Sequence, residues 1–199
     1  VMLGVPLILA ALGTVAYRYA HRDVPVAYAP QSAAVAQVNP GECQVQAAPE
    51  QGKGVMVRSN CIRHEGTFAK GVLQSGKITY ADGRVAEGTF VGGQQLGMGK
   101  LTWRDGRRYE GMFVEGRSSG PGVFIAADGT RYSGMFRPGV KLTGFGIRKN
   151  PDGSVLLGEF ADGKPSKKMV QVKDGKSEVA EIGDTGAPVK GTATLEVQQ

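Results

Sequence analysis

The middle of the chain alternates between apolar and polar residues in short runs that are separated by glycine-rich turns. The clearest unit, Gly97–Gly116, contains two such runs around an Asp105-Gly106 pair. Asp-Gly between alternating runs is a strong hairpin signal because glycine tolerates the positive φ of a tight turn. The pattern predicts a β-hairpin whose second strand turns Tyr109, Gly111 and Phe113 to one face.

This unit recurs along the chain at spacings of 22 to 24 residues. One hairpin cannot bury its own apolar face, so the copies are expected to stack into one sheet. The aligned glycines are Gly66, Gly88, Gly111, Gly134 and Gly158, and each is followed two residues later by a phenylalanine. The predicted core of the stack consists of Phe68, Phe90, Trp103, Tyr109, Gly111, Phe113, Tyr132, Gly134, Phe136 and Phe160.

These positions resemble the MORN repeat (membrane occupation and recognition nexus), whose pattern is about Tyr-x-Gly-x-Phe-x-x-Gly-x-x-x-Gly-x-Gly-x-x-x-x-x-Asp-Gly. Tyr109–Gly129 matches this pattern throughout, and the resemblance covers about Gly54–Gly163. It implies an all-β fold, an elongated single-layer antiparallel β-meander of about five hairpins. Such arrays serve as scaffolds, dimerisation modules or membrane-proximal recognition surfaces, and the repeat itself carries no catalytic residue.

The N-terminal segment is apolar, with no charged residue before Arg18. Seventeen residues in a helix span about 25 Å, close to the thickness of a bilayer core. The segment therefore predicts a transmembrane helix over residues 1–22. A cleavable signal peptide, with Thr14-Val15-Ala16 as a small-residue cleavage site, and a buried helix of a soluble domain are the alternatives.

Composition divides the rest of the chain into three parts. Residues 23–53 are rich in Ala and Pro and predict an extended linker. Residues 54–165 are expected to form the repeat sheet. Residues 166–199 are expected to add capping strands or to extend as a tail, with Asp174-Gly175 as the turn of a further hairpin and Gly183–Gln199 as an arm along a partner.

Cys43 and Cys61 are the two cysteines of the chain and flank the start of the repeats. A disulfide between them would place the repeats outside the cytoplasm, whereas two free thiols would not. Arg18 and Arg22, just after the apolar segment, favour the opposite side by the positive-inside rule. Giving the cysteines more weight predicts a bacterial-type inner membrane protein with its repeats on the periplasmic side.

The net charge of +6, with a pI near 9.4, is compatible with several kinds of acidic partner. Basic residues gather near the predicted turns in a rim that consists of Arg104, Arg107, Arg108, Arg131, Arg148 and Lys149. Such a rim can keep the protein soluble and protect the sheet edge from pairing, or alternatively it can bind anionic lipid. Nucleic acid is not expected as a partner, because the rim lacks interleaved exposed aromatic side chains.

The sequence predicts no catalytic residue, cofactor or metal site. Gly92–Thr102 resembles a phosphate-binding loop only superficially, because Gln94 and Leu101 replace residues that such a loop needs. His64 and Glu65 are expected on opposite faces of a strand, which excludes a shared acid–base role. We therefore expect a non-enzymatic, membrane-anchored accessory subunit. Its flat sheet would offer one aromatic and glycine face and one polar face to other subunits of a membrane complex or to a second copy. The alternative is a peripheral module for anionic lipid.

Overall fold

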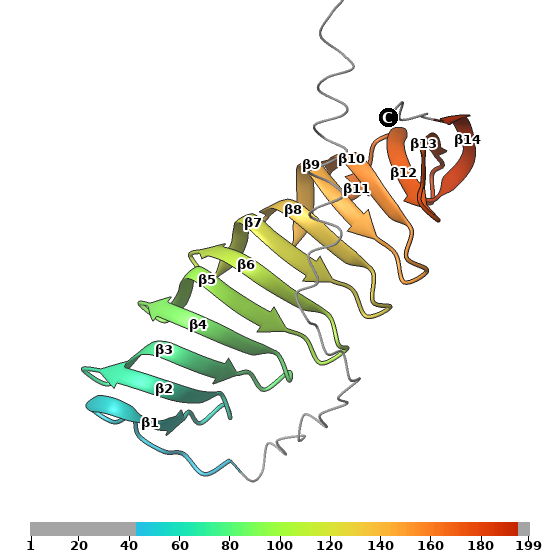
Figure 1. Ribbon diagram of the computed structural model, residues 1–199. Coiled ribbons are helices and arrows are strands. Elements are labelled where there is room, and N and C mark those ends of the chain that lie inside the picture. The colour runs from blue at the N-terminus through green and yellow to red at the C-terminus, as the bar shows by residue number, and fades with distance from the viewer. Residues whose placement is uncertain (1–42, 195–199) are drawn as a thin grey trace, which may run out of the picture. The chain divides into compact units, whose positions relative to one another are not determined.

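The computed structural model describes residues 43–194, which form one antiparallel β-sheet (Figure 1). The strands follow one another in sequence order across this sheet, except that the short β11 pairs only with β10. They are β1 (Gln51–Val57), β2 (Arg63–Ala69), β3 (Val72–Thr79), β4 (Val85–Val91), β5 (Gln94–Thr102), β6 (Arg108–Val114), β7 (Arg117–Ile125), β8 (Arg131–Arg137), β9 (Lys141–Lys149), β10 (Val155–Ala161), β11 (Lys164–Pro165), β12 (Lys168–Lys173), β13 (Lys176–Ile182) and β14 (Pro188–Thr194).

This architecture confirms the predicted all-β, single-sheet antiparallel meander and extends it beyond five hairpins. At the start, β1 begins at Gln51, three residues before the expected boundary. At the other end, Asp174-Gly175 turns the chain from β12 into β13. The prediction of an extended arm from Gly183 is wrong for the residues up to Thr194. A turn with a Gly183 N–H to Ala187 carbonyl hydrogen bond of 2.9 Å leads into β14, and this turn lacks the Asp-Gly pair that marks the earlier ones.

The predicted transmembrane helix over residues 1–22 and the linker up to residue 42 lie outside the described residues. Within residues 43–194 the structure contains no helix with the length and hydropathy of a membrane span.

A continuous row of glycines crosses the sheet from β1 to β10, and we call it the glycine seam. Each glycine of the seam lies directly opposite the next one on the neighbouring strand. Its members are Gly54, Gly66, Gly76, Gly88, Gly99, Gly111, Gly122, Gly134, Gly146 and Gly158. The repeat pattern therefore places the glycines of both strands of each hairpin on one line.

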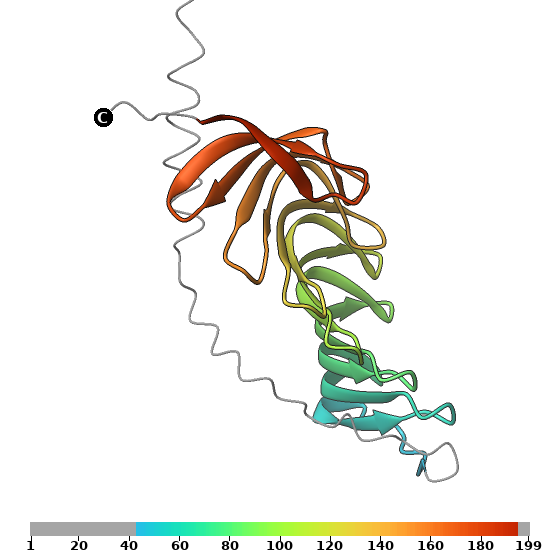
Figure 2. The ribbon, with the colours of Figure 1, turned by 90° about the vertical axis from the view of Figure 1, so that its right-hand side faces the viewer.

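The strands bend sharply at this seam. On β6, the rings of Tyr109 and Phe113 lie 5.3 Å apart between centroids, although four residues of extended strand span about 13 Å. The Tyr109 hydroxyl also donates a hydrogen bond of 3.2 Å to the Met112 carbonyl, across Gly111. The strand must therefore fold over Gly111 toward its aromatic side. Figure 2 shows the resulting curvature of the strands.

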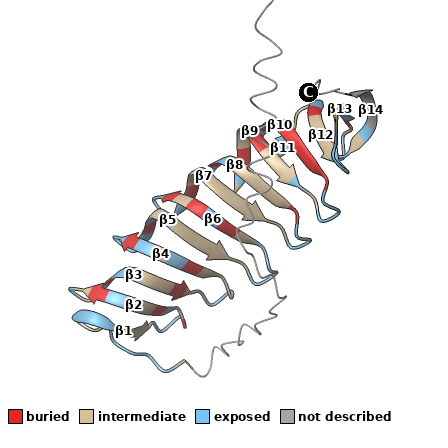
Figure 3. Cartoon of the chain, viewed as in Figure 1, coloured by how far each residue is buried: buried red, intermediate tan, exposed pale blue. Residues whose placement is uncertain are grey.

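Bending gives the sheet a buried inner face, which carries Tyr109 and Phe113, and an exposed outer face. Of the predicted core residues, Trp103, Tyr132 and Gly134 are half-buried and the others are buried. Burial raises the pKa of the Tyr109 hydroxyl to about 12. The buried positions recur from strand to strand in Figure 3. The expectation of a flat sheet with an open aromatic face is therefore wrong, because the two halves of each strand cover each other.

From Gly88 onward, a side chain of the inner face fills the space beside the seam glycines. The Tyr109 ring lies against Gly111 and Gly122, so that a Cβ atom on Gly122 would be 2.6 Å from the Tyr109 hydroxyl oxygen. In the same way, Gln95 covers Gly88 and Gly99, Leu142 covers Gly134 and Gly146, and Met169 covers Gly158. The seam requires glycine because the space for a Cβ atom is already occupied.

Replacing Gly122 by Ala should therefore destabilise the sheet without straining the backbone, since Gly122 does not have a positive φ. Overpacking of this kind costs about 1–3 kcal/mol. Urea unfolding of the Gly122→Ala variant should show this loss. Ser119→Ala on the same strand is the control, with an expected change within about 0.5 kcal/mol. Equal free energies of unfolding for the two variants would contradict the steric role of the seam.

Candidate interaction surface

One edge of the sheet carries a series of five-residue turns. In each, the first residue donates a backbone hydrogen bond to the carbonyl of the fifth, and the glycine at the fourth position has a positive φ. In all four turns the aspartate before that glycine accepts a hydrogen bond from the backbone N–H two residues later, for example Asp105 from Arg107 at 3.1 Å. The turns are Tyr80–Arg84, Trp103–Arg107, Ala126–Thr130 and Asn150–Ser154.

Arg58–Ile62 is a further turn of this type that the sequence does not reveal. Its first and fifth residues form the same hydrogen bond, at 3.0 Å. Cys61 takes the glycine position with a φ of 61°, and Asn60 takes the aspartate position, accepting a hydrogen bond from the Ile62 N–H. The two substitutions hide the turn because neither residue belongs to the Asp-Gly signature.

Cys43 and Cys61 form a disulfide, with their Cα atoms 5.4 Å apart. The disulfide ties the segment 43–50 to the first turn. That segment covers the start of the sheet: Gln46 pairs with Val57 through two backbone hydrogen bonds, and the Pro49 ring lies against Gly54 at the end of the seam. The pair therefore fastens a cap over β1.

The six residues of the predicted basic rim do not form one surface. Arg104 and Arg107 are exposed in a turn, where Arg107 pairs with Asp105 at 2.7 Å and lies over the Trp103 ring. Arg148 points to the inner side and donates a hydrogen bond of 2.8 Å to the Gly186 carbonyl. Three of the six, Arg108, Arg131 and Lys149, share one cross-strand row on the outer face.

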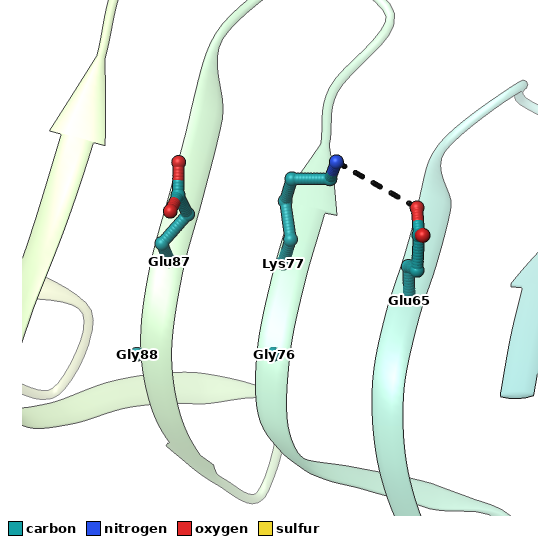
Figure 4. A pocket seen from close by; sticks show the side chains of 5 residues that line it. All are labelled: Glu65, Gly76, Lys77, Glu87 and Gly88. Atoms are coloured by element: carbon teal, nitrogen blue, oxygen red, sulfur yellow. Dashed lines mark ion pairs between the residues drawn. The ribbon is translucent and has the colours of Figure 1, made fainter. Parts of the chain in front are cut away.

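A second row on the outer face alternates in charge from β2 to β6. Lys77 and Lys100 separate Glu65, Glu87 and Glu110, each of which precedes a seam glycine. The two lysines form exposed ion pairs of 3.7 Å with Glu65 and 3.9 Å with Glu110. Figure 4 shows Glu65, Lys77 and Glu87 around a shallow depression over the seam. Because a lysine separates each carboxylate from the next, the row cannot act as a carboxylate pair, and exposed ion pairs contribute about 0–1 kcal/mol each.

His64 lies on the inner face, opposite to the side that carries Glu65. It is buried, and its pKa is lowered mainly by burial and to a smaller extent by the positive charge of Arg58. The neutral imidazole fills the aromatic position of the first repeat. The structure therefore separates His64 from Glu65, as strand alternation requires.

The large exposed apolar side chains gather on one part of the outer face. Seven of the nine among the described residues lie between the glycine seam and the edge that carries the short turns of two or three residues. We call this surface the apolar flank: Val72, Val91, Leu96, Met98, Val114, Met135 and Phe145. Met98 is 66% exposed, Phe145 55% and Met135 49%. The seam separates the apolar flank from the charged rows.

This fold and its repeating hairpins define the class of the protein, a single-sheet antiparallel β-repeat protein. The family model of the MORN repeat matches residues 87–107 and 109–131, so the chain contains MORN repeats. MORN repeats are protein or lipid interaction modules. No curated protein matches the chain.

Solved structures that are similar in part include the following two. One is the TCP domain of Drosophila Melanogaster SAS-4 (dCPAP) in complex with a proline-rich motif of Ana2, with 12% identity, 72% coverage of each chain and a TM-score of 0.36. The other is the TCP10 domain of Danio rerio CPAP in complex with a STIL peptide, with 16% identity, coverage of 74% of this chain and 97% of that chain, and a TM-score of 0.18. At these TM-scores neither structure informs the function of this chain.

Removal of the disulfide should lower the free energy of unfolding of the sheet. The size of this decrease should depend on which residue replaces Cys61. A disulfide that closes a loop of this length contributes about 3 kcal/mol. A non-glycine residue with a positive φ costs about 1–2 kcal/mol. The double variant Cys43→Ser, Cys61→Gly should therefore unfold at a higher urea concentration than the double variant Cys43→Ser, Cys61→Ser. Equal midpoints for the two double variants would contradict the assigned turn.

Proposed function

We propose that this protein is a non-enzymatic, membrane-anchored accessory subunit, and that its MORN sheet is a docking scaffold within a larger membrane complex. The observation that carries the proposal is the apolar flank. The inner face is filled by its own core, so it has no free aromatic surface for a partner. Contiguous exposed apolar side chains on a folded chain mark a contact surface.

The apolar segment at residues 1–22 supports the membrane anchor, and the Ala- and Pro-rich residues after it support a spacer between bilayer and sheet. The disulfide between Cys43 and Cys61 supports a position on the periplasmic side of a bacterial-type inner membrane, since disulfides persist in oxidising compartments. A reduced pair in freshly isolated, thiol-blocked protein would argue against this side.

The proposal predicts that mild detergent releases the protein as part of an assembly. Replacing Met98, Met135 and Phe145 together by Ser should free the protein from this assembly, because these are long or aromatic side chains of the apolar flank that are about half exposed or more. Size-exclusion chromatography after solubilisation measures the change. Val189→Ser is the matched control, since Val189 is 69% exposed but lies on β14. A monodisperse wild-type monomer without a co-purifying protein would contradict the docking function.

A module for anionic lipid is the second candidate, and the row of Arg108, Arg131 and Lys149 favours it. Arg131 lies directly opposite Lys149, an unfavourable like-charge pair, and among residues 43–194 none of the three has an ion-pair partner. This candidate predicts binding to vesicles that contain acidic lipid, weakening steeply as salt rises. Binding that is indifferent to salt and to acidic lipid would remove it.

A further inference from the structure

The apolar flank has a basic border on β7–β9. From β3 to β9, the outward positions between the seam and the turns hold apolar, Thr, Ser and Gln residues, except for Arg117, Arg137 and Lys141 at the turn ends of β7, β8 and β9. Along the turn edge of β6–β9, the exposed cations Arg117, Arg137 and Lys141 stand against one acidic residue, Glu115. Arg137 lies directly opposite Lys141, and no ion pair neutralises these three cations within the described part of the chain.

We propose that the apolar flank docks an amphipathic helix of a partner subunit, and that Asp or Glu residues border the apolar stripe of this helix. The proposal rests on the docking function above and specifies the chemistry of the partner. Apolar side chains of the helix would cover Met98, Met135 and Phe145. Its acidic border would face Arg117, Arg137 and Lys141, which lack acidic partners of their own.

The geometry of the flank favours a helix over a strand. The outward face of a sheet offers no free backbone groups, because the strands bond to their neighbours within the sheet. A single strand lying on that face would leave its own N–H and C=O groups unpaired, whereas a helix satisfies them internally. From Met98 on β5 to Phe145 on β9 the flank crosses four strand spacings, or about 19 Å. Roughly 13 residues of helix cover that distance.

The side chains of the flank are suited to contact with a docked helix. Met98 and Met135 are unbranched and flexible, so they can adapt to the ridges of a helix. A second copy of this chain fits less well, because it would bring the same excess of cations to the interface and offer them no acidic border. Charge complementarity therefore selects a different subunit with an acidic, amphipathic segment.

Site-specific photo-crosslinking of the full chain in its native membrane tests this proposal. A photoreactive phenylalanine analogue replaces Met98 or Met135 in turn, and Val189 as the control position. We expect positions 98 and 135 to cross-link to one segment of another protein, and position 189 not to. Mass spectrometry should show apolar residues at helical spacing in that segment, with Asp or Glu on its border.

Charge variants supply the second measurement. Arg137→Glu with Lys141→Glu should lower the cross-linking yield at position 135 by at least about fivefold, because the acidic border would then be repelled. Arg137→Lys with Lys141→Arg keeps the charge and should keep the yield. These exposed residues carry no core contact, so the urea midpoint of each variant should equal that of the wild type.

Other results overturn the inference in distinguishable ways. Cross-links to a second copy, to lipid, or to a segment without an acidic border would each show that the occupant is wrong. A complex that persists without cross-links at positions 98 and 135 would place docking on another surface and leave the scaffold function intact. An isolated monomer would remove the scaffold function and this inference together.

Discussion

The close approach of backbones along the glycine seam is the constraint on which the rest of the structure depends. A sheet of one layer normally needs a second layer to cover its apolar face. Here each strand bends over its seam glycine and covers its own aromatic residues, as the contact of Tyr109 with Phe113 shows. The bend is available because no Cβ atom occupies the inner side of Gly111 and Gly122. One sheet thereby provides both layers of its core.

The ends of the seam explain why the terminal parts of the chain depart from the repeat. At the first strand, Pro49 lies against Gly54, and the disulfide holds the segment that carries this proline. At the last, Met169 of β12 fills the space beside Gly158, and Arg148 reaches the Gly186 carbonyl in the β13–β14 turn. Repeats at an open end need such caps, because no further hairpin covers them.

Periodicity in the sequence was sufficient to predict the hairpins, the Asp-Gly turns and the phenylalanine positions, since these follow from local backbone chemistry and period-2 alternation. Curvature was not predictable, because alternation assigns residues to faces without saying how far a strand bends between them. That is why the aromatic face was expected to be open. Arg148 was grouped with Arg131 and Lys149 because all three lie near the turns, although strand alternation places Arg148 on the opposite face from Lys149. The turn at Cys61 was hidden by its unusual residues.

The apolar flank was also not predicted from the sequence. Met98 and Phe145 each sit between two glycines, at Gly97/Gly99 and Gly144/Gly146, so they read as part of the turn and seam signal. Their exposure follows only once the bend has turned the outer side of those glycines to solvent. The candidate surface thus depends on the same bend as the core, and it lies on the opposite face from the one that the repeat pattern emphasises.

The most direct measurement is the nuclear Overhauser effect between the aromatic rings of Tyr109 and Phe113 in selectively labelled protein. With the ring centroids 5.3 Å apart, the bent strand predicts a clear cross-peak between the two side chains. A flat strand would hold their Cα atoms about 13 Å apart and give none. Absence of the cross-peak in folded protein would contradict the self-covering sheet and, with it, the assignment of the outer flank as the docking surface.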